Sequence, residues 1–142
     1  MEPLTLPASL DSLILLRQYV VDAAADAGLS KEATYKLKLT VDEIATNIIS
    51  YGYAASDISG DITIEGEVLD DKLRITLQDT GVEFDSRKRE LPDEDELAKP
   101  LEERQIGGLG IFLTMRDVDI FDYKRIDNRN YNIFEMYIKK RA

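Results

Sequence analysis

The order of helical and strand patterns constrains the fold of this chain more than any other feature of its sequence. A short alternating pattern comes first, two long stretches with helical periodicity follow it, and the remaining alternating patterns come in pairs. Strands and helices do not alternate regularly, as they do in proteins with a parallel α/β sheet. The sequence therefore predicts an α+β fold, in which helices cover one face of a mostly antiparallel mixed sheet.

The first half of the chain is predicted to hold one edge strand and two helices. Pro7 ends the first alternating pattern and lacks a backbone N–H, so this strand belongs at a sheet edge. A serine before an apolar periodic stretch is a typical helix cap, and a glycine is typical of a helix end. The predicted elements are a strand at residues 4–6, a helix from Ser9 to about Ala27 that ends at Gly28, and a helix from Ser30 to about Tyr51.

The second half is predicted to hold two strand pairs with a charged segment between them. The pairs are residues 61–69 with 72–79, turning at Asp70 and Asp71, and residues 118–125 with 131–139, turning at Asp127 and Asn128. More than half of residues 86–105 are charged, which predicts a surface loop or a partial helix. A short helix is expected at residues 111–116. We expect residues 1–142 to form a single domain.

Residue composition excludes several classes of function. The chain has no cysteine and no histidine, which removes disulfides, thiol chemistry, the common zinc sites and histidine-dependent catalysis. The formal net charge of −10 disfavours nonspecific nucleic-acid binding, which depends on Lys and Arg. No apolar run approaches the length of a membrane span, and no secretory signal is visible, so a cytoplasmic protein is expected. A phosphate compound would have to be bound by backbone N–H groups, a metal ion or a few local cations.

Glu43 and Asn47 lie one above the other on the second predicted helix, because they are four residues apart. Their row borders the apolar stripe of this helix, so their side chains can face a cleft beside the core. An ordinary solvent-facing helix presents the same pair, and this alternative interpretation stays open for the pair alone. Its meaning depends on the motifs that accompany it.

Asp79 ends a strand whose other inward-facing positions, from Leu73 onwards, are apolar. A buried carboxylate needs a hydrogen-bond donor, because burying it unpaired costs several kcal/mol. The amino group of an adenine is one candidate donor, and a backbone N–H of the next turn is the other. Gly81 allows a sharp turn after the strand, and Phe84 could pack over a bound ring.

A cluster of glycines precedes the short helix predicted at residues 111–116. Free N–H groups at a helix N-terminus bind anions, and glycines leave them unobstructed. The candidate phosphate site consists of Gly107, Gly108, Leu109 and Gly110, although such a cluster also occurs for purely structural reasons. It is neither a P-loop nor a dinucleotide fingerprint, because the Lys-Ser/Thr pair and the third spaced glycine are missing.

These three motifs, in this order, resemble those of the GHKL ATPases, which include gyrase and the histidine kinases. The chain is still more similar to the bacterial single-domain serine kinases that act as anti-sigma factors. The similarity covers nearly the whole chain and includes the segments at residues 6–10, 41–47, 51–53 and 108–113. It implies a Bergerat-type ATP-binding sandwich with an ATP lid at about residues 86–105.

The resemblance also implies a role for each motif residue. Glu43 would be the general base for the hydroxyl of a partner's serine or threonine, and Asn47 would ligate the Mg²⁺ that bridges the phosphates. Asp79 would accept a hydrogen bond from the adenine amino group of ATP, with Gly81 admitting the base. The phosphates would be cradled by Gly107, Gly108, Leu109 and Gly110.

The implied function is that of an ATP-dependent serine/threonine protein kinase and anti-sigma factor. Its implied partners are a sigma factor and an anti-anti-sigma protein of the STAS type, which it would phosphorylate, and a homodimer is compatible with the family. A nucleotide-responsive sequestering module without kinase activity is the main alternative. An ATPase coupled to conformational change and a fold relative without nucleotide binding are the others.

Three features depart from the family pattern. Glu83 stands where relatives often carry glycine or proline, and a carboxylate near the nucleotide would weaken binding. Tyr51 takes the place of a frequent histidine. No residue between Asn130 and Ile133 is identified as the small polar residue that usually supports the adenine site. These departures are the reason for keeping the binding module as an alternative.

Overall fold

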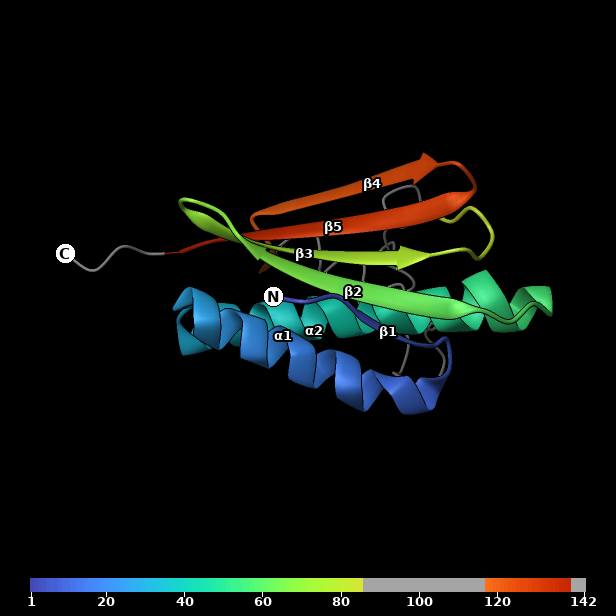
Figure 1. Cartoon of the computed structure of the whole chain (residues 1–142), viewed down its shortest axis with the longest axis horizontal. Helices are drawn as coiled ribbons and strands as arrows, with labels where there is room; N and C mark the ends of the chain where they lie inside the picture. Colours follow the sequence, from blue (N-terminus) through green and yellow to red (C-terminus); the bar gives the residue numbers. More distant parts are fainter. Residues whose placement is uncertain (86–116, 139–142) are drawn as a thin grey trace, which may run out of the picture.

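The computed structural model describes residues 1–85 and 117–138. In this part of the chain, α1 and α2 cover one face of a five-stranded sheet (Figure 1). The elements are, in order, β1 (Leu4–Pro7), a 3₁₀ helix (Leu10–Ser12), α1 (Leu13–Ala27), α2 (Lys31–Asn47), a π-helix (Ile48–Tyr53), a 3₁₀ helix (Ala54–Ser56), β2 (Asp61–Val68), β3 (Lys72–Asp79), β4 (Ile120–Ile126) and β5 (Arg129–Tyr137). The α+β prediction is confirmed. None of the described helices is both long enough and apolar enough to cross a bilayer.

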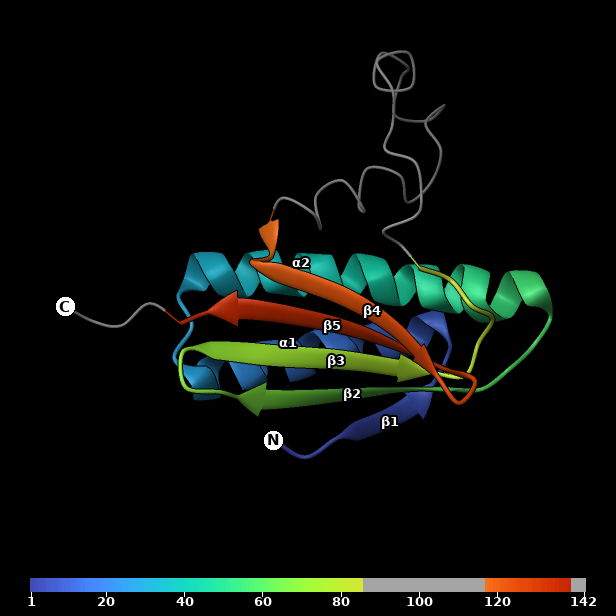
Figure 2. The same ribbon diagram turned by 90° about the horizontal axis from the view of Figure 1, so that it is seen from above.

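The sheet has the strand order β1-β2-β3-β5-β4, and every neighbouring pair in it is antiparallel. Figure 2 shows β1 at one edge and β4 at the other. The expected edge position of the first strand is therefore confirmed. The register of the two central strands, β3 and β5, places Asp79 opposite Asn130. The end of β3 and the start of β5 thus bring polar residues together at one end of the sheet.

The helix ends follow the predicted caps with one exception. Gly28 ends α1 with a φ of 76°, a left-handed conformation that glycine adopts without strain. The hydroxyl of Ser30 caps α2 by accepting a backbone hydrogen bond of 3.1 Å from its first turn. Ser9 is at the predicted cap position, before a 3₁₀ turn that runs directly into α1 at Leu13, but its side chain makes no cap bond. The hydroxyl of Ser12 instead donates to the last carbonyl of β1 at 2.7 Å.

The hairpin between β4 and β5 turns at the two predicted residues. Asp127 and Asn128 have positive φ angles of 52° and 64°, as a two-residue hairpin turn requires. Ile126 and Arg129 already pair on either side of the turn. The observed strands therefore begin and end up to two residues away from the predicted bounds.

The core lies between the sheet and the two helices. Inner positions of β2, β3 and β5 meet the apolar stripes of α1 and α2, and the residues with almost no exposure include Leu16, Val20, Leu37, Ile44, Ile62, Ile64, Leu73, Ile75, Leu77 and Phe134. Burying one such side chain stabilises the fold by about 1.5–3 kcal/mol relative to leaving it exposed. In this layer α1 packs on β2 and β3, and α2 packs on α1 and β5. On β3, Asp79 is the next inner position after Leu77.

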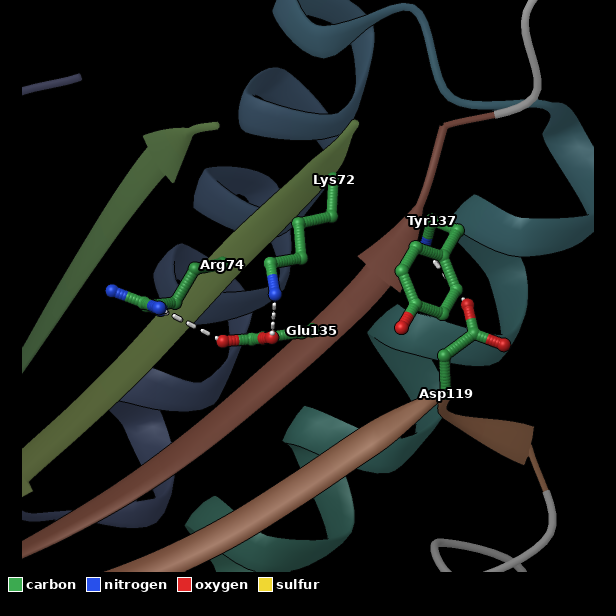
Figure 3. A network of polar contacts seen from close by, with 5 residues as sticks. All are labelled: Lys72, Arg74, Asp119, Glu135 and Tyr137. Carbon is green, nitrogen blue, oxygen red and sulfur yellow. Dashed lines mark hydrogen bonds and ion pairs between the residues drawn. The ribbon is translucent and has the colours of Figure 1, made fainter. Parts of the chain in front are cut away.

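The outer face of the sheet carries a charge cluster on β3 and β5 (Figure 3). Glu135 is 6% exposed, and its carboxylate pairs with Lys72 Nζ at 2.8 Å and Arg74 Nη2 at 3.0 Å. Burial raises the pKa of Glu135, but the hydrogen bonds from Lys72 and Arg74 outweigh it and the pKa is lowered overall. Close by, the backbone N–H of Tyr137 donates to Asp119 Oδ2 at 2.8 Å, which ties β5 to the residue before β4.

Candidate functional site

The C-terminal end of α2 carries the two polar residues that the sequence singles out. Asn47 is the last residue of α2 and is 2% exposed. Its amide nitrogen Nδ2 is buried and has no hydrogen-bond partner within residues 1–85 and 117–138. Glu43, one turn earlier, is partly exposed. An unpaired buried donor costs about 1–3 kcal/mol, so Asn47 has a donor that a ligand with an acceptor atom would satisfy.

The chain continues from α2 as a π-helix, Ile48–Tyr53. The helix predicted to reach about residue 51 is therefore correct in extent but wrong in type. Such π-helical turns are rare and occur frequently at functional sites. The carbonyl of Gly52 accepts a hydrogen bond from Val82 N at 3.1 Å, and the hydroxyl of Tyr53 accepts one from Thr80 N at 2.8 Å. These bonds join the π-helix to the turn after β3.

Asp79 ends β3 and is 2% exposed. Its Oδ1 accepts hydrogen bonds of 2.9 Å from Gly81 N and from Asn130 Nδ2. Its Oδ2 is buried and has no partner among the described residues. Burial raises the pKa of the Asp79 carboxyl, and the hydrogen bonds from Asn130 and Gly81 and the charge of Arg125 oppose this rise. Of the two donors that the sequence left open, the backbone N–H accounts for Oδ1, and Oδ2 still requires another donor.

Gly81 lies against the π-helix, at Gly52. A Cβ at this position would lie 2.7 Å from the carbonyl oxygen of Gly52, closer than real Cβ atoms come to another heavy atom. It would also lie 3.1 Å from Asp79 Oδ1, which is a tight contact. The φ angle of Gly81 is not positive. The glycine is therefore needed for close approach between two backbone segments, and not for an unusual backbone angle.

An aromatic pair flanks the turn after β3. The rings of Tyr51 and Phe84 stack with their centroids 6.0 Å apart and their planes inclined by 20°. The sequence suggested that Phe84 packs over a bound ring, whereas in the structure its ring packs on Tyr51. Glu83, next to Phe84 in sequence, is exposed, so solvent screens its charge and weakens the repulsion that its carboxylate would exert on an anionic ligand.

Asn130 and Asn132 are polar residues of this site that sequence reasoning missed. They are 2% and 1% exposed, and they occupy inner positions of β5, across from Asp79 and Leu77 of β3. Asn132 Oδ1 has no hydrogen-bond partner in the described part of the chain. The alternation of β5 contains the signal, because two asparagines replace apolar residues on its inner face. The meaning of this signal becomes clear once β3 and β5, which are not consecutive in the sequence, are known to be neighbours in the sheet.

Several sequence predictions fall on residues that the structure does not describe. The glycine cluster of Gly107, Gly108, Leu109 and Gly110 lies outside the described residues, and so do the ATP lid at about residues 86–105 and the helix expected at 111–116. Within the described ranges, no group of three or more carboxylate side chains could hold a metal ion by itself.

The described part of the site presents three buried polar atoms that lack partners: the donor Asn47 Nδ2 and the acceptors Asp79 Oδ2 and Asn132 Oδ1. Buried polar groups are almost always hydrogen-bonded, so each such atom needs an explanation. A ligand that carries both donors and acceptors would supply the missing partners. An aminopurine nucleotide is of this kind, with an amino group on its base and acceptor oxygens on its phosphates.

Comparison with known proteins gives a consistent family assignment. The family model described as "Histidine kinase-like ATPase domain" matches residues 6–138. The serine-protein kinase RsbW of Listeria monocytogenes serotype 4a (strain HCC23) is 37% identical over 123 residues, which are 83% of this chain and 77% of the relative. RsbW of Staphylococcus aureus (strain JH9) is 33% identical over 111 residues, or 75% of this chain and 68% of the relative.

A solved structure has the same fold at low sequence identity. The histidine kinase AdeS of Acinetobacter baumannii superposes with a TM-score of 0.52 over 99% of this chain and 70% of that chain, at 12% identity. At this identity the likeness concerns the fold alone. It agrees with helices that cover one face of an antiparallel sheet.

Proposed function

The chain belongs to the histidine kinase-like ATPase domain family, and from that premise we propose that it transfers the terminal phosphate of ATP to a serine or threonine of a partner protein. The two relatives, which are 37% and 33% identical over the aligned residues, are named serine-protein kinases. The observation that carries the proposal is Asp79, a buried carboxylate with one oxygen already bonded and the other without a donor.

The end of β3 would bind the base. Asp79 Oδ2 would accept a hydrogen bond from the adenine amino group, since it is buried and lacks a donor. Gly81 has no side chain, so the turn after β3 can lie against the Gly52 carbonyl. We propose that the absence of a side chain at this position also leaves room for the base. This pairing removes the cost of an unsatisfied buried carboxylate oxygen. Adenine recognition is therefore supported by the polar atoms that are present.

The end of α2 would face the phosphates. Asn47 Nδ2 is a buried donor without a partner, which fits an acceptor such as a phosphate oxygen. The amide oxygen of the same side chain would ligate Mg²⁺, because hard cations take carbonyl oxygens as ligands. When bound, Mg²⁺ neutralises phosphate charge. Further phosphate contacts would come from the backbone N–H groups of Gly107, Gly108, Leu109 and Gly110.

Glu43 would be the general base. It lies one turn before Asn47 on the same face of α2 and is partly exposed, so a partner's hydroxyl can reach it. Its carboxylate would hold the hydroxyl proton while the oxygen is positioned for phosphoryl transfer. Positioning and charge neutralisation supply most of the rate enhancement in this reaction. Glu43 is therefore the residue whose loss should separate nucleotide binding from transfer.

The proposed partners are those that the resemblance to the anti-sigma-factor serine kinases implies. We propose that the chain is an anti-sigma factor that binds a sigma factor and phosphorylates an anti-anti-sigma protein of the STAS type. A sequestering module that binds nucleotide without transferring phosphate is the alternative outcome. The exposed position of Glu83 removes one reason for preferring that alternative.

A phosphotransfer assay tests the proposal. The protein, Mg²⁺ and ATP labelled at the γ-phosphate are incubated with a STAS-type antagonist protein encoded beside its gene, and label on serine or threonine is measured. Glu43→Ala should reduce transfer by about 10²-fold or more while ATP affinity stays within a few-fold of the wild type. Glu32→Gln is the matched control, since Glu32 lies in the first turn of the same helix and is exposed.

The outcomes distinguish the functions. Transfer that depends on Glu43 supports the kinase and its assigned base. ATP binding without label on any bound protein supports the sequestering module. Equal transfer by the wild type and Glu43→Ala refutes the role of Glu43 as general base.

A further inference from the structure

Asn130 is held in one orientation by two donors from β4. The hydroxyl of Tyr123 donates a hydrogen bond to Asn130 Oδ1, and Arg125 Nη1 donates to the same oxygen at 2.9 Å. Only the oxygen of an amide can accept both bonds, so the side chain cannot be flipped. The NH₂ group of Asn130 must therefore point toward the end of β3.

The NH₂ group of Asn130 meets three acceptors. Nδ2 lies 2.9 Å from Asp79 Oδ1, 3.2 Å from the carbonyl oxygen of Gly81 and 3.0 Å from that of Val82. The carbonyl of Gly81 also accepts a bond of 3.3 Å from Arg125 Nη1. Asn130 thus fixes both the Asp79 carboxylate and the turn that follows it.

The consequence for Asp79 is that its two oxygens are not equivalent. Oδ1 has two donors, Asn130 Nδ2 and Gly81 N, each at 2.9 Å. A carboxylate oxygen has two lone-pair sites, so Oδ1 has no further acceptor capacity. Oδ2 has no donor among the described residues. The carboxylate therefore offers a ligand one acceptor oxygen instead of two.

We infer that Asn130 is the specificity-determining residue by which this site selects adenine over guanine. Guanine presents two adjacent donors, its ring N–H and its amino group, which pair with both oxygens of a carboxylate. Adenine presents a single amino group, for which one oxygen is enough. By occupying Oδ1 of Asp79, Asn130 removes the second acceptor that guanine requires. This inference rests on the proposed nucleotide binding and goes beyond it.

The test is the ratio of ATP affinity to GTP affinity. Each nucleotide competes, at concentrations up to millimolar, with a fluorescent ADP analogue in the presence of Mg²⁺. Asn130→Ala should weaken ATP binding and leave GTP binding unchanged or stronger. The preference for ATP should therefore fall by about tenfold or more, which corresponds to the free energy of one charge-assisted hydrogen bond. Arg125→Met, which removes one of the donors that orient the amide, should shift the ratio in the same direction by less. Arg125 is partly exposed, so this variant keeps the test valid if Asn130→Ala does not fold.

Glu135→Gln is the matched control, since it lies on β5 but on the opposite face of the sheet and should leave the ratio unchanged. If Asn130 had a merely structural role, its substitution would lower the ATP affinity and the GTP affinity by the same factor. A parallel loss in the variants, or GTP that still fails to compete at millimolar concentration, overturns the inference. A wild-type protein that binds neither nucleotide refutes the proposed function and with it the inference. A wild-type preference for ATP that both variants retain refutes the inference alone.

Discussion

At the scale of single residues, two buried carboxylates on neighbouring strands have opposite electrostatic environments. Glu135 faces two cations, which lower its pKa against the effect of burial. Asp79 is buried with neutral donors and a more distant guanidinium, and its pKa is raised. Glu135 therefore has its partners within the fold and stabilises it when ionised. Asp79 is left with an unsatisfied oxygen, as expected of a binding residue that costs stability.

Glu135→Gln should change the acid side of the stability profile. The folded-state pKa of Glu135 is below its ordinary value of 4.5, so its stabilisation is complete above that pH and is lost as pH falls through the folded pKa. The variant should unfold at a lower temperature at neutral pH. Below pH 4.5 its free energy of unfolding should fall less steeply than that of the wild type, by at most about 1.4 kcal/mol per pH unit, the value for one proton. Thermal unfolding followed by circular dichroism from neutral to acid pH measures both.

The control for this prediction is Glu2→Gln, which removes an exposed carboxylate near the N-terminus. Its profile should follow that of the wild type. Coinciding slopes for wild type and Glu135→Gln below the ordinary pKa would show that the charge cluster contributes no proton linkage.

At the scale of elements, periodicity and caps predict most of the fold. Ser30, Gly28 and the Asp127–Asn128 turn define boundaries through local geometry, and the structure confirms each of them. Ser9 is also at the start of a helical segment, but that segment begins with a 3₁₀ turn and Ser9 makes no side-chain cap bond. The apolar spacing predicts a helix at these residues but does not distinguish a π-helix from an α-helix. The π-helix is hydrogen-bonded to the turn after β3, which is distant in sequence.

The candidate site is predictable only where its residues lie in one local pattern. Glu43 and Asn47 share a helix face, and Asp79 ends an alternating strand. Asn130 escapes prediction because its role depends on the pairing of β3 with β5. That pairing is a matter of sheet order, which local sequence does not specify.

The junction of the π-helix with the turn after β3 makes Gly81 sensitive to any side chain. Gly81→Ala places a Cβ 2.7 Å from the Gly52 carbonyl oxygen, so the turn must move away from the π-helix. Overpacking of this kind costs about 1–3 kcal/mol, and ATP affinity should fall by about tenfold or more because Asp79 moves with the turn. Calorimetric titration with ATP and urea unfolding give the two quantities.

Gly52→Ala is the contrasting variant at the other side of the same contact. Its Cβ would lie 3.8 Å from Ile48 Cγ2, an ordinary van der Waals distance. It should bind ATP with nearly wild-type affinity. If Gly81→Ala also binds ATP as the wild type does, close approach of the two backbones is not required for the site.

At the scale of the whole molecule, the site lies at the margin of a single core that joins the described sheet and helices. Its unsatisfied atoms belong to α2, β3 and β5, elements that pack together through that core. A ligand that bonds to all three would therefore stabilise the fold as a unit. This links nucleotide affinity to global stability.

Nucleotide should raise the melting temperature by an amount that grows with the logarithm of the ratio of nucleotide concentration to dissociation constant. At about 100 times the dissociation constant, Mg-ATP should add about 2.7 kcal/mol to the free energy of unfolding. Asn47→Ala and Asp79→Ala should lose most of this increment, whereas Glu135→Gln should start from a lower melting temperature and keep the increment. Differential scanning fluorimetry with and without millimolar ATP and Mg²⁺ provides the measurement. The absence of any shift in the wild type would contradict nucleotide binding at this site.

The shared acceptor of Tyr123 and Arg125 also limits how this protein can evolve. Replacing Asn130 first would remove an acceptor of both the Tyr123 hydroxyl and the Arg125 guanidinium. Replacing either donor first would remove one of the two bonds that orient the Asn130 amide. Change at these three positions is therefore expected to be concerted, so that lineages with another residue at 130 also differ at 123 and 125. The base specificity of the site would then depend on three positions that change together in evolution.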